Sequence, residues 1–189
     1  MLSAADALKQ LMEGNARFAG ERSLHPHQDT VRRVKITEGQ RPFAAVLGCA
    51  DSRIPPEVVF DQGLGDLFVV RVAGNVVDAY VLASIEYAVS HLGTPLVVVL
   101  GHTACGAVTA AATGGECEGH LGELMEAIRP AIEGARARGE DEIVRHAIYL
   151  NARMAAEQLR RDELIAASGA EVVSVIYDMD SGRAEVLES

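Results

Sequence analysis

The chain has 189 residues, 49% of them apolar, and its 17 Lys and Arg against 27 Asp and Glu give a formal net charge of −10. A chain of this length buries roughly 70% of the surface that its unfolded form exposes, so it can build one core without disulfides and is not expected to be disordered. We expect a single domain over residues 1–189, with a helix and arm at 1–41 and an α/β core at 42–189. The charge argues against nucleic acid or a membrane surface as a partner, because both need a basic face.

The start of the chain has no basic segment followed by an apolar one, and no apolar run approaches the roughly 18 residues of a membrane span. These features predict a cytoplasmic location. The three cysteines are an odd number, which disfavours a disulfide framework and favours a metal-binding or catalytic role.

The first element predicted is a helix that begins at Ser3 and ends near Gly20, with Leu8, Leu11 and Met12 on its apolar side. A polar loop follows over residues 21–41, with one helical turn between Thr30 and Glu38.

Three short apolar runs at residues 43–47, 67–70 and 96–100 are typical of strands covered on both faces. A short helix is predicted between the first and second runs, and a longer one at 79–92 between the second and third. Further helices are predicted after the third run at 104–113, 119–137 and 140–167. A fourth strand is expected at 171–177, with a hairpin partner at 183–187. The pattern predicts an α/β fold with a mostly parallel sheet, strand order 2-1-3-4 and an edge hairpin strand, flanked by helices.

Three metal-ligating side chains follow two of these strands. Cys49 comes after the first strand, and His102 and Cys105 come after the third. In the order 2-1-3-4 these strands are neighbours, and their carboxyl ends border the crevice where α/β sheets bind ligands. Two thiolates and one imidazole suit a catalytic zinc ion, which keeps a fourth position for water. The pair His102-x-x-Cys105 alone is equally compatible with a packed thiol and a core histidine.

The segment Cys49-Ala-Asp51-Ser-Arg53 adds an acid and a base at the same strand end. An arginine fork binds a carboxylate through two hydrogen bonds and fixes its orientation. Asp51 held in this way can accept a hydrogen bond from zinc-bound water or hydroxide. The alternative is a surface salt bridge of little energetic value.

Cys-Ala-Asp-Ser-Arg at 49–53, Val-Val-Arg at 69–71, Gly74-Asn75, Ile-Glu-Tyr-Ala at 85–88 and Gly-His-Thr-Ala-Cys-Gly at 101–106 together resemble the β-class carbonic anhydrase signature. The resemblance implies that Cys49, His102 and Cys105 bind one zinc ion and that Asp51 and Arg53 form the catalytic dyad. It also implies a set of residues that bind substrate or line the cleft, namely Gln40, Phe68, Ala73, Tyr87 and Gly106. Ala73 stands where many relatives have Val, which would widen the apolar wall.

One subgroup of the family has a Trp three residues before the first cysteine and an allosteric bicarbonate pocket. This chain has Val46 there and no Trp, and it has Gln40, which favours the plant-type, non-allosteric subgroup. The resemblance further implies a homodimer or homotetramer whose cleft is completed by a partner subunit and whose N-terminal helices exchange, with Leu8, Leu11 and Met12 as the exchanged apolar stripe.

The expected function is that of a zinc lyase: reversible hydration of CO2 to bicarbonate and a proton through a zinc-bound hydroxide. Two alternatives remain from the residues alone, a CS2 or COS hydrolase on the same zinc site and a non-enzymatic zinc-binding or sensing protein. The pair Cys117-x-x-His120, the arm residues His25 and His27, and Arg71 have no assigned role at this point.

Overall fold

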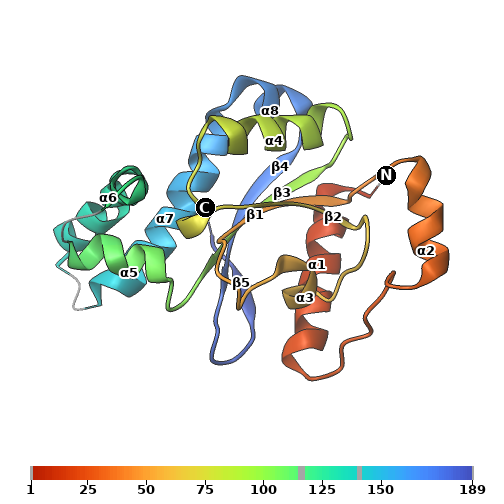
Figure 1. Cartoon of the computed structure of the whole chain (residues 1–189), viewed down its shortest axis with the longest axis horizontal. Coiled ribbons are helices and arrows are strands. Elements are labelled where there is room, and N and C mark those ends of the chain that lie inside the picture. Colours follow the sequence, from red (N-terminus) through yellow and green to blue (C-terminus); the bar gives the residue numbers. More distant parts are fainter. Residues whose placement is uncertain (1, 115–117, 140–141, 189) are drawn as a thin grey trace.

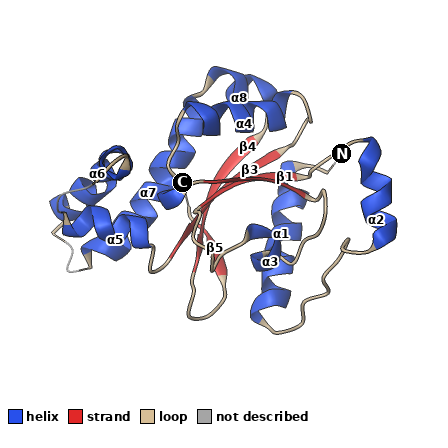
Figure 2. Ribbon diagram, in the orientation of Figure 1, coloured by secondary structure: helices blue, strands red, loops and turns tan. Residues whose placement is uncertain are grey.

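The chain forms one five-stranded sheet with helices on both faces (Figures 1 and 2). A computed structural model describes residues 2–114, 118–139 and 142–188. The strands are β1 (Ala44–Gly48), β2 (Leu67–Arg71), β3 (Leu96–His102), β4 (Glu171–Tyr177) and β5 (Ala184–Val186). Their order is β2-β1-β3-β4-β5; the first four are parallel and β5 is antiparallel to β4. The predicted fold class, strand order and edge hairpin are confirmed.

The helices among the described residues are α1 (Ala4–Ala19), α2 (Thr30–Lys35), η1 (Ile36–Glu38), α3 (Pro56–Val59), η2 (Ala73–Asn75), α4 (Ala79–Ser90), α5 (Gly106–Thr113), α6 (Leu121–Ala137), α7 (Ile143–Arg161) and α8 (Glu163–Ser168). Helices α4, α7 and α8 cover one face of the sheet, and α1 and α3 cover the other (Figure 2). Helices α5 and α6 pack beside α7, beyond the carboxyl ends of the strands.

Burial explains why the apolar runs become central strands. Every residue of β1 and β3 is buried, whereas β2, at the edge of the sheet, is only partly buried. A strand that is covered on both faces needs apolar side chains at consecutive positions, which is the pattern that the sequence shows. The core therefore lies on both sides of the β1 and β3 pair.

Two predicted helix boundaries are wrong. The helix expected at 104–113 begins at Gly106, because Ala104 adopts a left-handed conformation (φ 54°) and Cys105 is the N-cap. The helix expected at 140–167 is two helices, because Asp162 is extended and its carboxylate accepts hydrogen bonds from the first N–H groups of α8. Residue 140 lies outside the described part of the chain. Strand β3 also continues two residues further than expected, so that His102 is its last residue.

The first helix begins at Ser3 as predicted, with the Ser3 side chain accepting a hydrogen bond from the Asp6 N–H. Its apolar side faces its own chain: Leu11 is completely buried, and Leu8 and Met12 pack against the same core. Within one chain, Leu11 therefore belongs to the core of its own sheet. The stripe is used to cover the face of the sheet that also carries α3.

Two buried carboxylates tie the N-terminal arm to the core. Asp61 pairs with Arg17 at 2.6 Å and also accepts hydrogen bonds from the backbone N–H groups of Leu24 and His25. Asp66 accepts hydrogen bonds from His27 at 2.8 Å and from Arg32 at 3.1 Å. The arm is thus held by charge and hydrogen bonds rather than by apolar packing.

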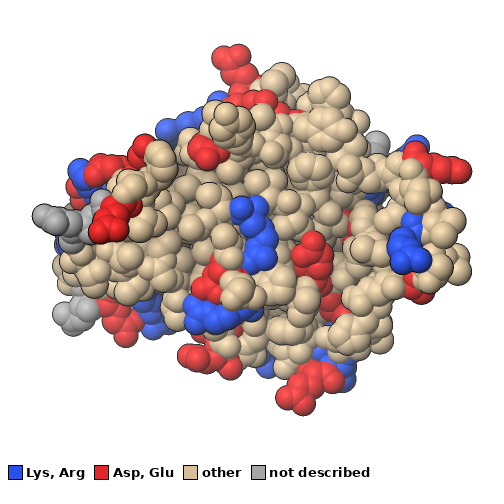
Figure 3. All heavy atoms as spheres, in the orientation of Figure 1, with Lys and Arg blue, Asp and Glu red and all other residues tan. Residues whose placement is uncertain are grey.

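None of the helices that the structure describes combines the length and the apolar character needed to cross a membrane. On the face seen in Figure 3, acidic and basic side chains are interspersed. The net charge of −10 is therefore not gathered into one acidic region on that face.

We predict that Asp61→Ala lowers the free energy of unfolding by roughly 3 kcal/mol, because it leaves Arg17 and two backbone N–H groups without their partner. Burial raises the pKa of Asp61, but hydrogen bonds from the Leu24 N–H and Arg17 outweigh it and hold the pKa below the usual value. A carboxylate with a lowered folded-state pKa stabilises the fold fully above its unfolded pKa, about 3.9, and loses this contribution as the pH falls through the folded value.

Urea unfolding of the wild type and Asp61→Ala at pH 7 and pH 3 checks this prediction. Glu13→Ala, which removes an exposed ion pair with Lys9, is the control and should change stability by no more than about 0.5 kcal/mol. An Asp61→Ala effect as small as that of the control at pH 7, or one equally large at pH 3, would contradict it.

Candidate metal centre

The topology brings three predicted ligands together. Cys49 follows β1, His102 ends β3, and Cys105 caps α5; β1 and β3 are neighbours, with Gly48 opposite Leu100. The ligand atoms of Cys49, His102 and Cys105 lie within 4.8 Å of one another. The left-handed backbone at Ala104 reverses the chain, so that His102 and Cys105 both reach the cluster. All three side chains are buried.

The histidine is arranged as a metal ligand would be. Its Nδ1 lies 2.9 Å from the carbonyl oxygen of Thr103, which can only accept, so Nδ1 carries the proton and Nε2 is left as an acceptor. The Nε2 atom is buried and has no hydrogen-bond partner. A buried polar atom without a partner is costly, and a cation between this nitrogen and the two sulfurs would satisfy it. The donor set therefore fits a soft or borderline metal ion.

The two sulfurs differ in charge. A hydrogen bond from Cys105, helped by the backbone N–H groups of Asp51 and Gly74, lowers the pKa of Cys49 to about 4, although burial acts in the opposite direction. The Gly74 nitrogen lies 3.2 Å from the Cys49 sulfur. The hydrogen bond to Cys49 and burial raise the pKa of Cys105. The lowered pKa of the Cys49 thiol favours an anionic sulfur, the form that binds a metal ion.

Asp51 and Arg53 form the predicted pair beside the cluster. Arg53 donates from Nε at 2.8 Å and from Nη2 at 2.6 Å to the two carboxylate oxygens of Asp51, and its backbone N–H adds a third bond. Arg53 also donates to the carbonyl of Ala104, between His102 and Cys105. These hydrogen bonds hold the pKa of Asp51 well below its usual range. Asp51 therefore stays an ionised acceptor with a fixed orientation.

Sequence reasoning left Arg71 without a role, and the structure gives it one. Its side chain donates to the carbonyl of Cys49 at 2.9 Å and to that of Asp51 at 2.5 Å. Arg71 ends β2, next to the carboxyl end of β1. It thereby fixes the loop that carries the cysteine and the carboxylate. Its position at a strand end was the available signal, but its backbone targets are not visible in a sequence.

The five expected substrate residues separate into two groups. Ala73 and Gly106 are close to the cluster: Ala73 precedes the glycine that donates to Cys49, and Gly106 follows Cys105. Phe68 and Tyr87 lie elsewhere, with ring centroids 6.2 Å apart. Phe68 is opposite Ala45, four residues before Cys49, which corresponds to about 13 Å along a strand.

Gln40 also lies toward the other end of the sheet. It is exposed, and the nearby Pro42 and Phe43 bind Thr94 and Asp66, which come just before β3 and β2. Within one chain, the structure does not bring Gln40, Phe68 or Tyr87 to the cluster.

Other sequence candidates are not joined to this centre. Cys117 lies outside the described residues, and His120 is an exposed partner of Glu123. His27 binds Asp66, and the backbone N–H of His25 binds Asp61, so both belong to the attachment of the arm.

Comparison with known proteins agrees with this geometry. The sequence profile of the carbonic anhydrase family matches residues 44–184. Carbonic anhydrase 2 of Mycobacterium tuberculosis is 44% identical over 186 residues, covering 94% of this chain and 90% of the relative, and a carbonic anhydrase of Pseudomonas aeruginosa is 32% identical over 200 residues, covering 96% and 88%.

Solved structures show the same fold. A tetrameric β-carbonic anhydrase of Sordaria macrospora superposes with a TM-score of 0.79 at 29% identity, covering 97% of this chain and 98% of that one. The β-carbonic anhydrase CafA of Aspergillus fumigatus gives 0.78 at 31% identity, covering 97% and 90%. With the Cys-His-Cys cluster at the carboxyl edge of the same sheet, these matches show that the chain belongs to the carbonic anhydrase family, in its β class.

Proposed function

We propose that this carbonic anhydrase catalyses the reversible hydration of CO2 to bicarbonate and a proton, with one zinc ion held by Cys49, His102 and Cys105. The observation that carries the proposal is the buried, unpartnered Nε2 of His102 beside the two cysteine sulfurs. Two sulfurs and one imidazole nitrogen are a common ligand set of catalytic zinc. When bound, zinc makes a nucleophile from water at neutral pH by lowering the pKa of that water from about 16 toward about 7.

The chain's own residues orient this nucleophile. Asp51 is ionised and accepts only, so it takes a hydrogen bond from the attacking water and thereby fixes the direction of its lone pair. Arg53 and the backbone keep the carboxylate from rotating, since three hydrogen bonds reach it. Arg71 holds the same loop through the carbonyls of Cys49 and Asp51.

We place Ala73 and Gly106 in the substrate pocket of the same chain, because both adjoin the cluster. Gln40, Phe68 and Tyr87 we assign to the cleft of a second copy. Strand β2 is a partly buried edge of the sheet, and Tyr87, which contacts Phe68 beside it, is 46% exposed. A twofold axis beside this edge and perpendicular to the strands makes the two β2 strands antiparallel, so that the amino end of one, with Phe68, meets the carboxyl end of the other, near Cys49. A homodimer or homotetramer built in this way would complete each site.

Two further assignments accompany the proposal. Val46 is completely buried in β1, where the allosteric subgroup has Trp, and together with Gln40 this supports the plant-type, non-allosteric form. Two cysteines that must remain reduced to bind metal suit the cytoplasm. The arm and core, residues 1–41 and 42–189, are proposed to act as one domain, joined through Asp61 and Asp66.

We predict that the wild type and Cys117→Ser each bind one zinc ion per chain and hydrate CO2, whereas Cys49→Ser loses both properties. Asp51→Asn should keep zinc but lose roughly 100-fold in kcat/KM, because an amide presents an N–H where the carboxylate presents only acceptors. Stopped-flow CO2 hydration and elemental analysis on the same samples measure both quantities, with COS and CS2 assayed in parallel. One zinc per chain without CO2 hydration would contradict the proposal, and turnover of COS or CS2 alone would identify a related hydrolase.

We also predict that the wild type is a dimer or tetramer at micromolar concentration and that Tyr87→Glu shifts it toward monomers and lowers kcat/KM. The introduced charge would be buried beside the β2 edge of the partner. Leu164→Glu on α8, at a side chain that is 54% exposed, is the matched control and should change neither property. Light scattering coupled to size exclusion measures the mass. A fully active wild-type monomer would refute the shared cleft.

A further inference from the structure

A buried asparagine connects α7 to the metal centre through one glycine. We infer that Asn151 is a positioning residue that holds Gly74 so that its N–H stays directed at the sulfur of Cys49. The inference deepens the proposed function and rests on it, since it assumes that Cys49 binds the metal.

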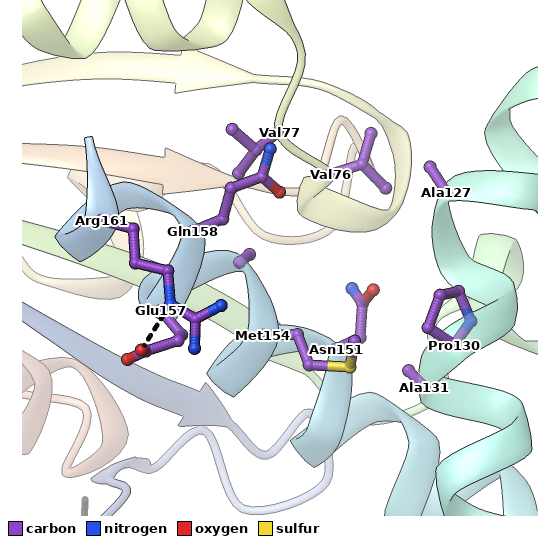
Figure 4. A pocket seen from close by; sticks show the side chains of 11 residues that line it. Val76, Val77, Ala127, Pro130, Ala131, Asn151, Met154, Glu157, Gln158 and Arg161 are labelled. Atoms are coloured by element: carbon purple, nitrogen blue, oxygen red, sulfur yellow. Dashed lines mark hydrogen bonds and ion pairs between the residues drawn. The ribbon is translucent and has the colours of Figure 1, made fainter. Parts of the chain in front are cut away.

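The connection consists of two hydrogen bonds. The side-chain amide of Asn151 donates to the carbonyl oxygen of Gly74 at 2.7 Å, and the N–H of Gly74 donates to the sulfur of Cys49 at 3.2 Å. Both bonds are buried, and Asn151 is 6% exposed. Figure 4 shows Asn151 on α7 with its amide directed toward the segment that carries Val76, just after Gly74.

Gly74 needs such an anchor because of its conformation. Its φ is +67°, and a Cβ atom there would lie 2.8 Å from the end of the Ile128 side chain, so glycine is favoured at this position. Glycine is also the residue with the greatest freedom to adopt other backbone conformations. The hydrogen bond from Asn151 removes this freedom, because rotating the Gly74 peptide would leave its buried carbonyl without a donor.

This hydrogen bonding affects the charge on the Cys49 sulfur. An N–H that donates to a metal-binding thiolate withdraws charge from it, and such outer hydrogen bonds tune both the affinity for the metal and its electronic state. Asn151 thus acts on the centre without touching it. A polar residue among Ala147, Ile148, Ala152 and Ala155, on the buried side of α7, was the only sequence signal for this role.

The surroundings of Asn151 favour a clean experiment. Asn151 lines a cavity of about 570 Å³ between α6, α7 and the segment Val76-Val77, so a replaced side chain has room (Figure 4). Gln158, two turns further along α7, lines the same cavity. It carries the same amide group, and none of the hydrogen bonds described above involves it. Its side chain is exposed, whereas that of Asn151 is buried, so it is a control for changing an amide at this cavity and not for burial.

The test uses the full-length protein loaded with Co²⁺, whose sulfur-to-metal charge-transfer absorption reports on the thiolates. We compare the wild type with Asn151→Asp, Asn151→Leu, Gln158→Glu and Gln158→Leu, and we measure the Co²⁺ dissociation constant by competition with a chelator. Asn151→Asp keeps the shape but replaces the donor with an acceptor, and Asn151→Leu removes the hydrogen bond; circular dichroism verifies that each variant is folded.

We expect both Asn151 variants to shift the charge-transfer band to longer wavelength, because the thiolate loses its donor, and to bind Co²⁺ about 10-fold more weakly. The Gln158 variants should match the wild type in band position and affinity. Asn151 variants that are folded and match the wild type in both measurements would overturn the inference while leaving the metal site intact. A wild type without any charge-transfer band would overturn the proposed metal site itself, and the inference with it.

Discussion

The parallel pairing of β1 with β3 is the constraint on which the rest of the site depends. It places the end of one strand, with Cys49, next to the end of the other, with His102 and the turn to Cys105. Ladder hydrogen bonds and the complete burial of both strands fix this juxtaposition, so the ligands are held by the most stable part of the fold. Residues positioned by strands in this way are held more precisely than residues on loops.

Hydrogen bonds from neighbouring elements then fix the loops that carry the ligands. Arg71 from β2 donates hydrogen bonds to the loop after β1, and Arg53 links that loop to the turn after β3. Asn151 from α7 donates a hydrogen bond to the carbonyl of Gly74, beside the Cys49 sulfur. Each contact comes from a different element, so that the sheet and the helical layer both support the centre. The acidic character of the whole chain plays no part in this, because the charges that matter are those of the two cysteine sulfurs, one carboxylate and two arginines.

The sequence predicted the sheet order, the strands and the ligand cluster, because continuous apolar runs and residues at strand ends report directly on a parallel sheet. It failed to predict helix ends and turns that depend on a single local contact. The Asp162 cap that divides α7 from α8 interrupts no periodicity, and the left-handed turn at Ala104 has no glycine to mark it. It also failed where distant segments meet: Arg71 binds backbone carbonyls, and Asn151 binds a residue 77 positions away.

The most direct test of the central claim is a crystal structure of the zinc-loaded protein at pH 8, with anomalous scattering measured at the zinc edge. The account predicts one zinc peak among Cys49, His102 and Cys105, with sulfur distances of about 2.3 Å and a nitrogen distance of about 2.0 Å, and with Asp51 still bound to Arg53. A zinc peak elsewhere in the chain, or a zinc ion ligated by Asp51 with Arg53 released, would contradict it.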